Sequence, residues 1–321
     1  MVFRIFFFGI ILLLASLASA AEKTPIKIGV LAFGTLDWEL TALREDSDTE
    51  NTGFKLDIQR LANPEAGKIA LQSAAVDVIV SDWIWVARQR STGIKLSFYP
   101  YSTSAGALIV GTGSGIKSIQ DLKGKRLGIA GGELDKNWLL LLALGAKQNL
   151  DLNSSVSKVF GAPPLLNQQL KQNGLDAVLT YWNFAARLEA EGYTKILDGK
   201  NLMQDLGINA NLATLGYVFR EDWANANKAA LVQFFNATKQ AKNRLCTDLA
   251  VWQKIVPVSQ ENTAENQAVL RQNYCAGRIE NWGENERLAA EQLYQLLFQY
   301  SHHQLTGDAE HLPAGTFWAN E

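Results

Sequence analysis

Acidic and aromatic side chains stand directly after several predicted strands of this chain. Asp37 and Trp38 follow the first strand, Asp82 and Trp83 follow a later one, and Trp182 follows another. Carboxylates supply counter-charge, and aromatic faces hold planar or cationic groups by stacking or cation–π attraction. Because strand ends of open α/β sheets are where ligands bind, these residues indicate a site for a small organic solute.

The loop after residues 125–130 leaves a second chemistry open. Gly131 and Gly132 precede a predicted helix, and the backbone N–H groups of such a turn can cradle a small anion. Lys136 would assist, although a lysine there is most often a solvated helix charge. The sequence therefore allows either an amine or heteroaromatic solute or a small anion, with a slight preference for the aromatic interpretation.

Most of these residues also have a purely structural interpretation. Trp38 and Trp83 would then pack a core, Asp37 would complement a helix dipole, and Asp82 would cap the next helix. The residues that we expect to contact the solute are Asp37, Trp38, Ser81, Asp82, Trp83, Ser104, Gly131, Gly132, Glu133, Tyr181, Trp182 and Asn183.

The sequence offers few residues suited to catalysis or to metal binding. The three histidines are His302, His303 and His311, so a Ser-His-Asp arrangement would require the C-terminal region to fold back. No Cys/His group has the spacing of a zinc site, and no GxxxxGK[ST] phosphate loop is present. We therefore expect no catalytic residue, no metal and no cofactor.

The first twenty residues have the pattern of a cleaved export signal. Arg4 gives a positive start, residues 5–17 are apolar, and Ala18-Ser19-Ala20 is a small-x-small cleavage site. A membrane anchor is the alternative, but the run is short and no stop-transfer flank follows it. We expect residues 1–20 to be a signal peptide and the mature protein to be periplasmic.

Cys246 and Cys275 are the two cysteines of the chain. In an oxidising compartment two thiols favour one disulfide, although spacing alone cannot show that they meet. Two separate buried thiols are the alternative.

The composition indicates a globular protein that does not bind nucleic acid. The 321 residues include 30 basic and 32 acidic ones without a Lys/Arg run, and 47% are apolar. Strands and helices alternate in two units before a helical C-terminal region, which predicts an α/β fold. The expected strands are residues 26–31, 54–59, 76–80, 125–130, 156–160, 176–180 and 214–220.

One segment of the chain resembles a known family. Residues 116–129 read IKSIQDLKGKRLGI, which is similar to a signature segment of type II periplasmic binding proteins. The nearest group is the nitrate/sulfonate/taurine class of ABC-transporter binding proteins. Residues 66–71 followed by the strand 76–80 also fit that class. No familiar sulfonate or nitrate signature is found in the expected pocket, so the resemblance does not carry over a ligand.

The resemblance implies two lobes, each a mixed sheet flanked by helices, joined by two crossing strands. Lobe 1 would comprise residues 24–103 and 216–321, and lobe 2 residues 104–215. Hinges are expected near 104–107 and 215–217, where Gly106 and Gly216 would help to absorb a rotation or would serve ordinary strand and turn geometry.

The resemblance also implies a function. We expect a monomer that captures a small molecule between its lobes and delivers it to the permease of an ABC importer. The alternatives are an exported sensory or accessory subunit that acts on a partner enzyme or receptor, and an enzyme on the same fold related to thiamine-pyrimidine synthase. That enzyme depends on a site rich in histidine and cysteine, which the first 240 positions of this chain lack.

Overall fold

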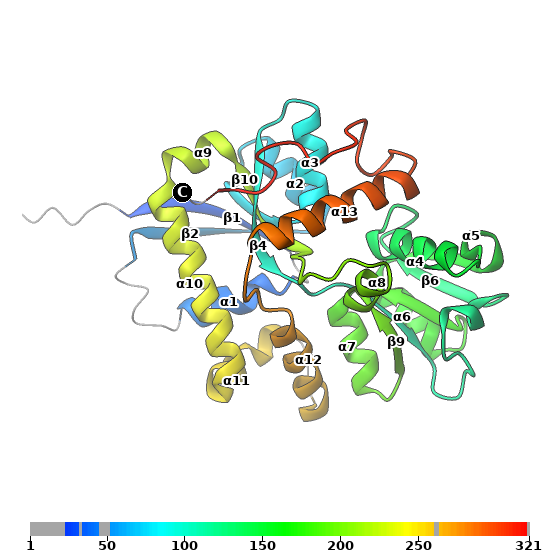
Figure 1. Ribbon diagram of the computed structural model, residues 1–321. Coiled ribbons are helices and arrows are strands. Elements are labelled where there is room, and N and C mark those ends of the chain that lie inside the picture. The colour runs from blue at the N-terminus through cyan, green and yellow to red at the C-terminus, as the bar shows by residue number, and fades with distance from the viewer. Residues whose placement is uncertain (1–22, 32–33, 45–51, 260–262, 320–321) are drawn as a thin grey trace, which may run out of the picture.

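The computed structural model describes residues 23–31, 34–44, 52–259 and 263–319, which form two five-stranded mixed sheets flanked by helices (Figure 1). This arrangement confirms the predicted α/β class. The predicted signal peptide lies outside the described residues. Within the described ranges, no helix combines the length and the apolar character needed to cross a membrane.

The first sheet is built around the nearly continuous apolar strand β3. Its neighbour β1 runs parallel to both β2 and β3, whereas β10 returns antiparallel to β3 and β4. Central strands covered on both faces are apolar throughout, which explains the VIVS sequence of β3. The strand order is β2 (Phe54–Leu61), β1 (Thr24–Leu31), β3 (Val78–Ser81), β10 (Leu215–Arg220) and β4 (Leu96–Ser102).

The second sheet repeats this plan with a different set of strands. Here β6 is parallel to β7 and β8, and β5 is antiparallel to β8 and β9. The strand order is β7 (Ser157–Gly161), β6 (Arg126–Ala130), β8 (Ala177–Thr180), β5 (Ala107–Val110) and β9 (Thr194–Asp198).

The helices begin where the sequence supplies caps. Asn63 accepts the Ala66 N–H at the start of α2, and Pro64 occupies its first turn, where a missing N–H costs nothing. The helices that precede the second sheet or follow β10 are α1 (Leu36–Arg44), α2 (Pro64–Gln72), α3 (Trp83–Ser91), α9 (Glu221–Ala226), α10 (Lys228–Thr247), α11 (Leu249–Ser259), α12 (Ala264–Ala276) and α13 (Glu284–Tyr300). The helices among the strands of the second sheet are the 3-10 helix η2 (Ile119–Leu122), α4 (Lys136–Lys147), α5 (Leu152–Ser155), α6 (Pro163–Lys171), α7 (Trp182–Ala190) and α8 (Gly199–Asp205).

Two segments cross between the sheets and lie against each other. Residues 103–106 connect β4 to β5, and residues 206–214 connect α8 to β10. Thr214 ties them together, because its hydroxyl donates to the Ser104 carbonyl at 2.6 Å and its N–H donates to the Ser102 carbonyl at 2.9 Å. Residues 215–217 lie inside β10, so the second crossing precedes the expected hinge position. The predicted lobe boundaries remain a prediction.

Close packing requires glycine at the two positions where hinges were expected. A Cβ at Gly106 would lie 2.6 Å from the Thr180 carbonyl oxygen, and one at Gly216 would lie 2.2 Å from the Phe98 ring. Neither contact leaves room for a side chain. The structure therefore gives these glycines a packing role at the crossing.

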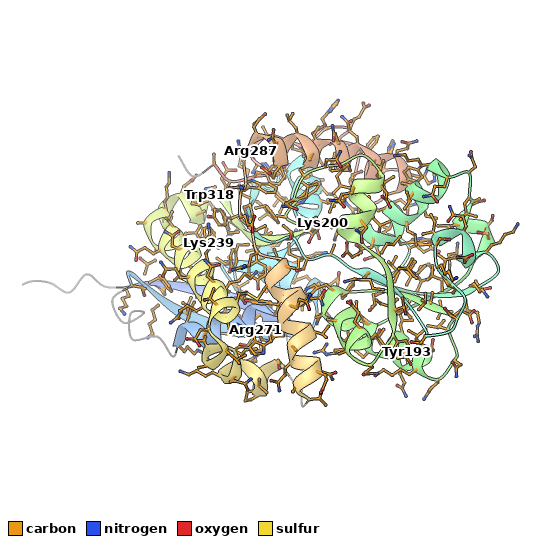
Figure 2. All side chains as sticks on the ribbon, turned by 60° about the horizontal axis from the view of Figure 1, so that its bottom comes forward. Tyr193, Lys200, Lys239, Arg271, Arg287 and Trp318 are labelled. Atoms are coloured by element: carbon orange, nitrogen blue, oxygen red, sulfur yellow. A yellow bond between two sulfur atoms is a disulfide. The ribbon has the colours of Figure 1, made fainter. Side chains whose placement is uncertain are left out.

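One hydrophobic cluster runs from the first sheet into the second. It joins Trp83 and Tyr294 to Leu127 and Trp138, with α13 packed against α4 between the sheets. Figure 2 shows side chains filling both halves, with Trp318 on the side of the first sheet and Tyr193 at the opposite end of the molecule. The two halves therefore share apolar packing in this conformation.

The C-terminal segment covers the outer edge of β4. The Phe98 N–H donates to the Thr316 carbonyl and the Trp318 N–H donates to the Phe98 carbonyl, both at 2.9 Å. Arg90 holds the segment by donating from Nε to the Ala314 carbonyl at 2.6 Å. We call residues 313–318 the C-terminal strap.

A disulfide joins two of the C-terminal helices. Cys246 at the end of α10 is bonded to Cys275 at the end of α12, across a sequence separation of 29. This bond fixes α12 against α10 on the side of the first sheet.

Candidate functional site

The strand-end loops of the two sheets meet. Lys136, the first residue of α4, contacts Asp82, which precedes α3, with 3.2 Å between Nζ and Oδ2. Trp182 at the start of α7 contacts Trp38 in α1, with 6.2 Å between ring centroids. These two contacts join loops of the first sheet to loops of the second, and we call the region that they define the strand-end interface.

Two N-cap carboxylates act on the Lys136 ammonium, and that of Asp82 contacts it at 3.2 Å. Asp82 caps α3 by accepting the Trp85 N–H at 2.9 Å, and Asp135 caps α4 by accepting the N–H groups of Asn137 and Trp138. The N-cap aspartates are thus held by their own helices, and Asp82 presents its second oxygen, Oδ2, to the lysine. Two further charged residues act on this group, because Lys68 lies near Asp82 and Glu65 pairs with Lys68 at 3.6 Å.

The ionisation of this group follows from burial and charge. Burial alone would raise the pKa of Asp82, but Lys136, the Trp85 N–H and Lys68 together lower it. Burial alone would lower the pKa of Lys136, but Asp82 and Asp135 raise it. For Asp135 burial prevails and its pKa is raised, although Lys136 opposes the shift. The cluster is therefore an ion pair with an additional, incompletely compensated carboxylate.

The Gly131–Gly132 turn borders the same cluster. Both residues have positive φ, +87° and +86°, which favours glycine. A Cβ at Gly131 would lie 3.0 Å from an Asp135 carboxylate oxygen and 3.0 Å from the Tyr181 hydroxyl. Glycine therefore lets Asp135 and Tyr181 approach this turn.

Aromatic rings from both halves meet at the other part of the interface. Trp38 lies 5.3 Å from Tyr274 and 5.7 Å from Trp252, between ring centroids, and Trp182 lies 6.3 Å from Tyr274. Edge-to-face and tilted geometries of this kind are favourable for aromatic rings. Trp182 of the second half therefore inserts into an aromatic group of the first.

A buried ion pair lies beneath these rings. Glu39 Oε1 accepts from the hydroxyls of Tyr101 at 2.7 Å and Tyr274 at 2.5 Å, and lies 3.5 Å from Lys242 Nζ. Lys242 donates to the Tyr101 carbonyl and lies 3.6 Å from the centroid of the Tyr101 ring. Burial raises the pKa of Glu39, with Lys242 opposing, and lowers the pKa of Lys242, with Glu39 opposing. Sequence reasoning missed this pair because nothing local links α1 to α10.

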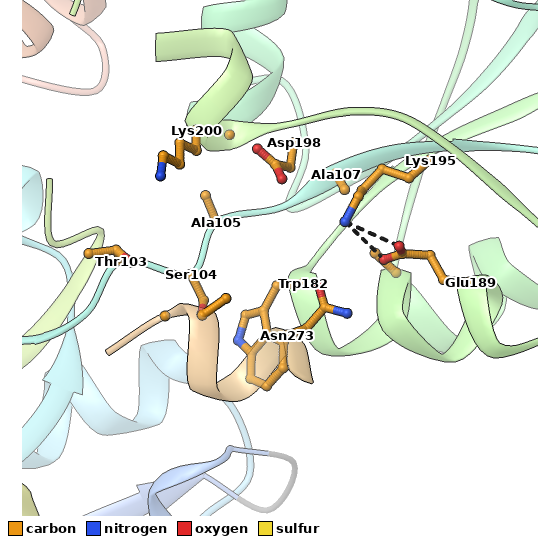
Figure 3. A pocket seen from close by; sticks show the side chains of 14 residues that line it. Thr103, Ser104, Ala105, Ala107, Trp182, Glu189, Lys195, Asp198, Lys200 and Asn273 are labelled. Atoms are coloured by element: carbon orange, nitrogen blue, oxygen red, sulfur yellow. Dashed lines mark hydrogen bonds and ion pairs between the residues drawn. The ribbon is translucent and has the colours of Figure 1, made fainter. Parts of the chain in front are cut away.

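A cavity of about 90 Å³ lies beside Trp182 and the first crossing segment (Figure 3). Ser104 and Trp182 line it, together with Asn273 of α12 and the ion pair of Lys195 and Glu189, whose atoms lie 3.1 Å apart. A volume of this size holds several water molecules or a small organic group. Two expected contact residues, Ser104 and Trp182, thus border a real void.

The remaining residues that were expected to contact a solute differ in how deeply they are buried and in what they contact. Trp83 is 1% exposed, its Nε1 donates to the Ala213 carbonyl at 2.9 Å, and it packs on Tyr294 and Phe317. Trp83 therefore packs in a core, as the structural alternative proposed. Trp38 is 3% exposed, so most of its surface is also buried by packing. Arg60 donates two hydrogen bonds to the Asp37 carboxylate, one to each oxygen.

Ser81 and Asn183 are buried beside the interface, whereas Glu133 is exposed. Lys136 and Asp135 belong to the charged cluster, although neither is among the residues that the sequence predicts to contact the solute. The signal was their position at the first turn of a helix that follows a strand end.

Solved structures resemble this fold at low sequence identity. The alkanesulfonate-binding protein SsuA of Xanthomonas axonopodis pv. citri, bound to MOPS, is 19% identical with a TM-score of 0.67, covering 93% of this chain and 99% of that one. The periplasmic aliphatic sulphonate-binding protein SsuA of Escherichia coli is 16% identical with a TM-score of 0.71, covering 90% and 96%. The periplasmic nitrate-binding protein NrtA of Synechocystis PCC 6803 is 13% identical with a TM-score of 0.55, covering 92% of each chain.

These likenesses confirm the two-lobed fold expected from residues 116–129. None of the curated proteins compared with the chain matches it. The model of the family described as NMT1/THI5 like matches residues 50–248, which is more than half of the chain. The chain therefore belongs to the NMT1/THI5-like family.

Proposed function

We propose that this protein is an exported solute-binding protein that takes up a small molecule at the strand-end interface and delivers it to an ABC-importer permease. The observation that carries the proposal is the meeting of strand-end loops from both sheets, through Asp82–Lys136 and Trp38–Trp182. A solute that bridges these loops would bias the relative position of the two halves, because it contacts both.

The similar structures support this proposal. The proteins compared above are named for binding sulfonates or nitrate, and those of Escherichia coli and Synechocystis are described as periplasmic. In this proposal the halves open and close about the two crossing segments, which Thr214 holds together. Periplasmic location of this chain, delivery to a permease, and the monomeric state belong to the proposal.

The enzyme alternative has less support among the described residues. A site rich in histidine and cysteine would be needed, but both cysteines are joined in the disulfide. His311 pairs with Glu291 at 2.7 Å near the C-terminus, and no group of three metal-ligating side chains is found in the described ranges. These residues do not assemble such a site at the strand-end interface.

Native mass spectrometry of the purified mature protein tests the proposed function. We expect a small molecule to co-purify, to be lost on unfolding, and to raise the melting temperature when it is added back. If no preparation carries a solute, and if no solute from a broad thermal-shift screen stabilises the protein, the function is refuted.

A further inference from the structure

Two helix starts at the strand-end interface, those of α3 and α4, have already bonded some of their anion-binding groups to carboxylates of the chain. Backbone N–H groups at a helix N-terminus are the usual donors to a bound anion. At α3 the Asp82 carboxylate accepts the Trp85 N–H, and at α4 the Asp135 carboxylate accepts those of Asn137 and Trp138. An incoming anion would have to compete with two carboxylates of the chain itself.

The charged groups of this region favour a cation. Glu65, Asp82 and Asp135 supply three carboxylates, against the two ammonium groups of Lys68 and Lys136. The carboxylates therefore outnumber the ammonium groups. A solute cation would correct this imbalance, whereas an anion would increase it.

Ammonium groups of the chain already rest on the acids and rings of this region. Lys136 lies 3.2 Å from Asp82, and Lys68 lies 5.6 Å from the centroid of the Trp85 ring. Lys242 lies 3.6 Å from the centroid of the Tyr101 ring. Acidic and aromatic surroundings of this kind are those in which proteins hold organic ammonium ions.

A second, independent observation comes from Glu39. Its side chain is 0% exposed, and Oε2 has no hydrogen-bond partner among the described residues. The Tyr217 hydroxyl and Trp252 Nε1 are also unpartnered there, but Glu39 Oε2 is the carboxyl oxygen of the three. Glu39 is bonded to Tyr274, whose ring contacts Trp182 at the interface. The unmet bonding capacity beside the interface therefore includes a carboxylate oxygen, which accepts and attracts positive charge.

We propose that the solute is an organic cation whose ammonium group takes the place of the Lys136 ammonium beside Asp82. This inference rests on the proposed function and specifies its substrate class. Its organic part would contact Tyr181, which is 38% exposed, and the indole of Trp182. Lys136 can give way because its side chain is 32% exposed and is attached at the first position of α4. The exchange moves one ammonium into water as another enters, so no charge is left buried alone.

The direction in which the Lys136→Met substitution changes solute affinity tests this proposal. Isothermal calorimetry would use choline, its neutral carbon analogue dimethylbutanol, propanesulfonate and nitrate as probes. We expect choline to bind the wild type, with the neutral analogue at least about ten-fold weaker and neither anion binding. Lys136→Met removes an internal competitor and should tighten choline binding by about ten-fold, whereas it would abolish binding of an anion held by Lys136.

Matched variants separate charge from folding. Asp82→Asn keeps an oxygen for the helix cap but removes the charge, so choline binding should weaken by about ten-fold or more. Asp151→Asn makes the same change at the cap of α5 and serves as its control. Lys147→Met, at the far end of α4, is the control for Lys136→Met. Melting temperatures of all four variants show whether they fold.

The outcomes distinguish this inference from the proposed function. Binding of propanesulfonate or nitrate that is lost in Lys136→Met refutes the cation and leaves solute binding intact. Recovery of a neutral or anionic molecule from the native protein would also refute the cation but not solute binding. Unchanged choline affinity in Asp82→Asn would lead to the same conclusion. The absence of any bound or stabilising solute refutes both proposals.

Discussion

The tryptophans show how neighbouring residues of one type differ in role. Trp83 is enclosed by Tyr294, Phe317 and the Ala213 carbonyl, whereas Trp182 is partly exposed, crosses between the halves and borders the cavity. Both follow a strand end in the sequence, so their neighbours along the chain do not separate them. The difference arises from α13 and the C-terminal strap, which cover Trp83.

Replacing each tryptophan by alanine should therefore have opposite consequences. Trp182→Ala should weaken binding of the co-purified solute by about ten-fold or more while largely preserving stability. Trp83→Ala should lower the free energy of unfolding by about 3–5 kcal/mol, because it leaves a large cavity in the core. Calorimetric titration and urea unfolding measure the two effects, and Trp223→Ala on α9 is the control for binding. Equal affinity of Trp182→Ala and the wild type would remove Trp182 from the site.

The strand-end residues could be predicted in part from the sequence. A strand followed by a helix brings its end loop to the sheet edge, so the strand-end positions of Asp82, Lys136, Tyr181 and Trp182 could be predicted. Their contact with a solute stays a prediction. Glu39 and Lys242 could not be paired, because α1 and α10 are joined only by the folded chain. Burial of Trp38 likewise depends on Trp252 and Tyr274, which lie on helices far away in the sequence.

At the scale of elements, most strands and helices were predictable from apolar periodicity and caps. Residues 96–110 are one long apolar, Ser/Thr-rich segment of the sequence, which the structure divides into β4 and β5, with the crossing at 103–106. The short elements β9 and α8 were not predicted. Their apolar patterns are too short to show a period. Strand β9 pairs with β5, and Asp198 caps the start of α8 by accepting the Asn201 N–H.

The disulfide between α10 and α12 makes a prediction at this scale. It closes a loop with a sequence separation of 29, so its loss should lower the free energy of unfolding by about 3.6 kcal/mol. Urea unfolding with and without reductant measures the loss, and the Cys246→Ala/Cys275→Ala variant should reproduce it without responding to reductant. Two free thiols in the oxidised wild type would contradict the bond.

At the scale of the whole molecule, the two halves contact each other on both sides of the crossing segments. Helix α12 packs on α7 and helix α13 packs on α4, while Asp82–Lys136 links the loops between them. Opening of the molecule would have to separate Trp182 from Trp38 and Tyr274. The contacts at the interface thus set how readily the halves part.

Acid should weaken this connection. The pKa of Asp82 is lowered from its ordinary value of 3.8, so its ion pair contributes above that value and is lost as the pH falls through the lowered pKa. The pH dependence of Asp135 has the opposite sign. Its pKa is raised, so its contribution to stability falls as the pH rises. We expect the radius of gyration of the ligand-free wild type, from small-angle X-ray scattering, to increase below about pH 4.

The Asp82→Asn variant is the comparison for this change. It lacks the titrating carboxylate but keeps a cap for α3, so at neutral pH it should already have the larger radius. Identical scattering of the variant and the wild type at neutral pH would show that the ion pair does not hold the halves together.

The strap over β4 has a consequence for handling the protein. Residues 313–318 satisfy backbone groups of Phe98 that would otherwise face solvent on the last strand of the first sheet. A shortened form without this segment would present an unpaired strand flanked by aromatic side chains, a template onto which a second molecule can add. Expression tags at this end should therefore be attached beyond Trp318, so that oligomers induced by the tag are not mistaken for a native assembly.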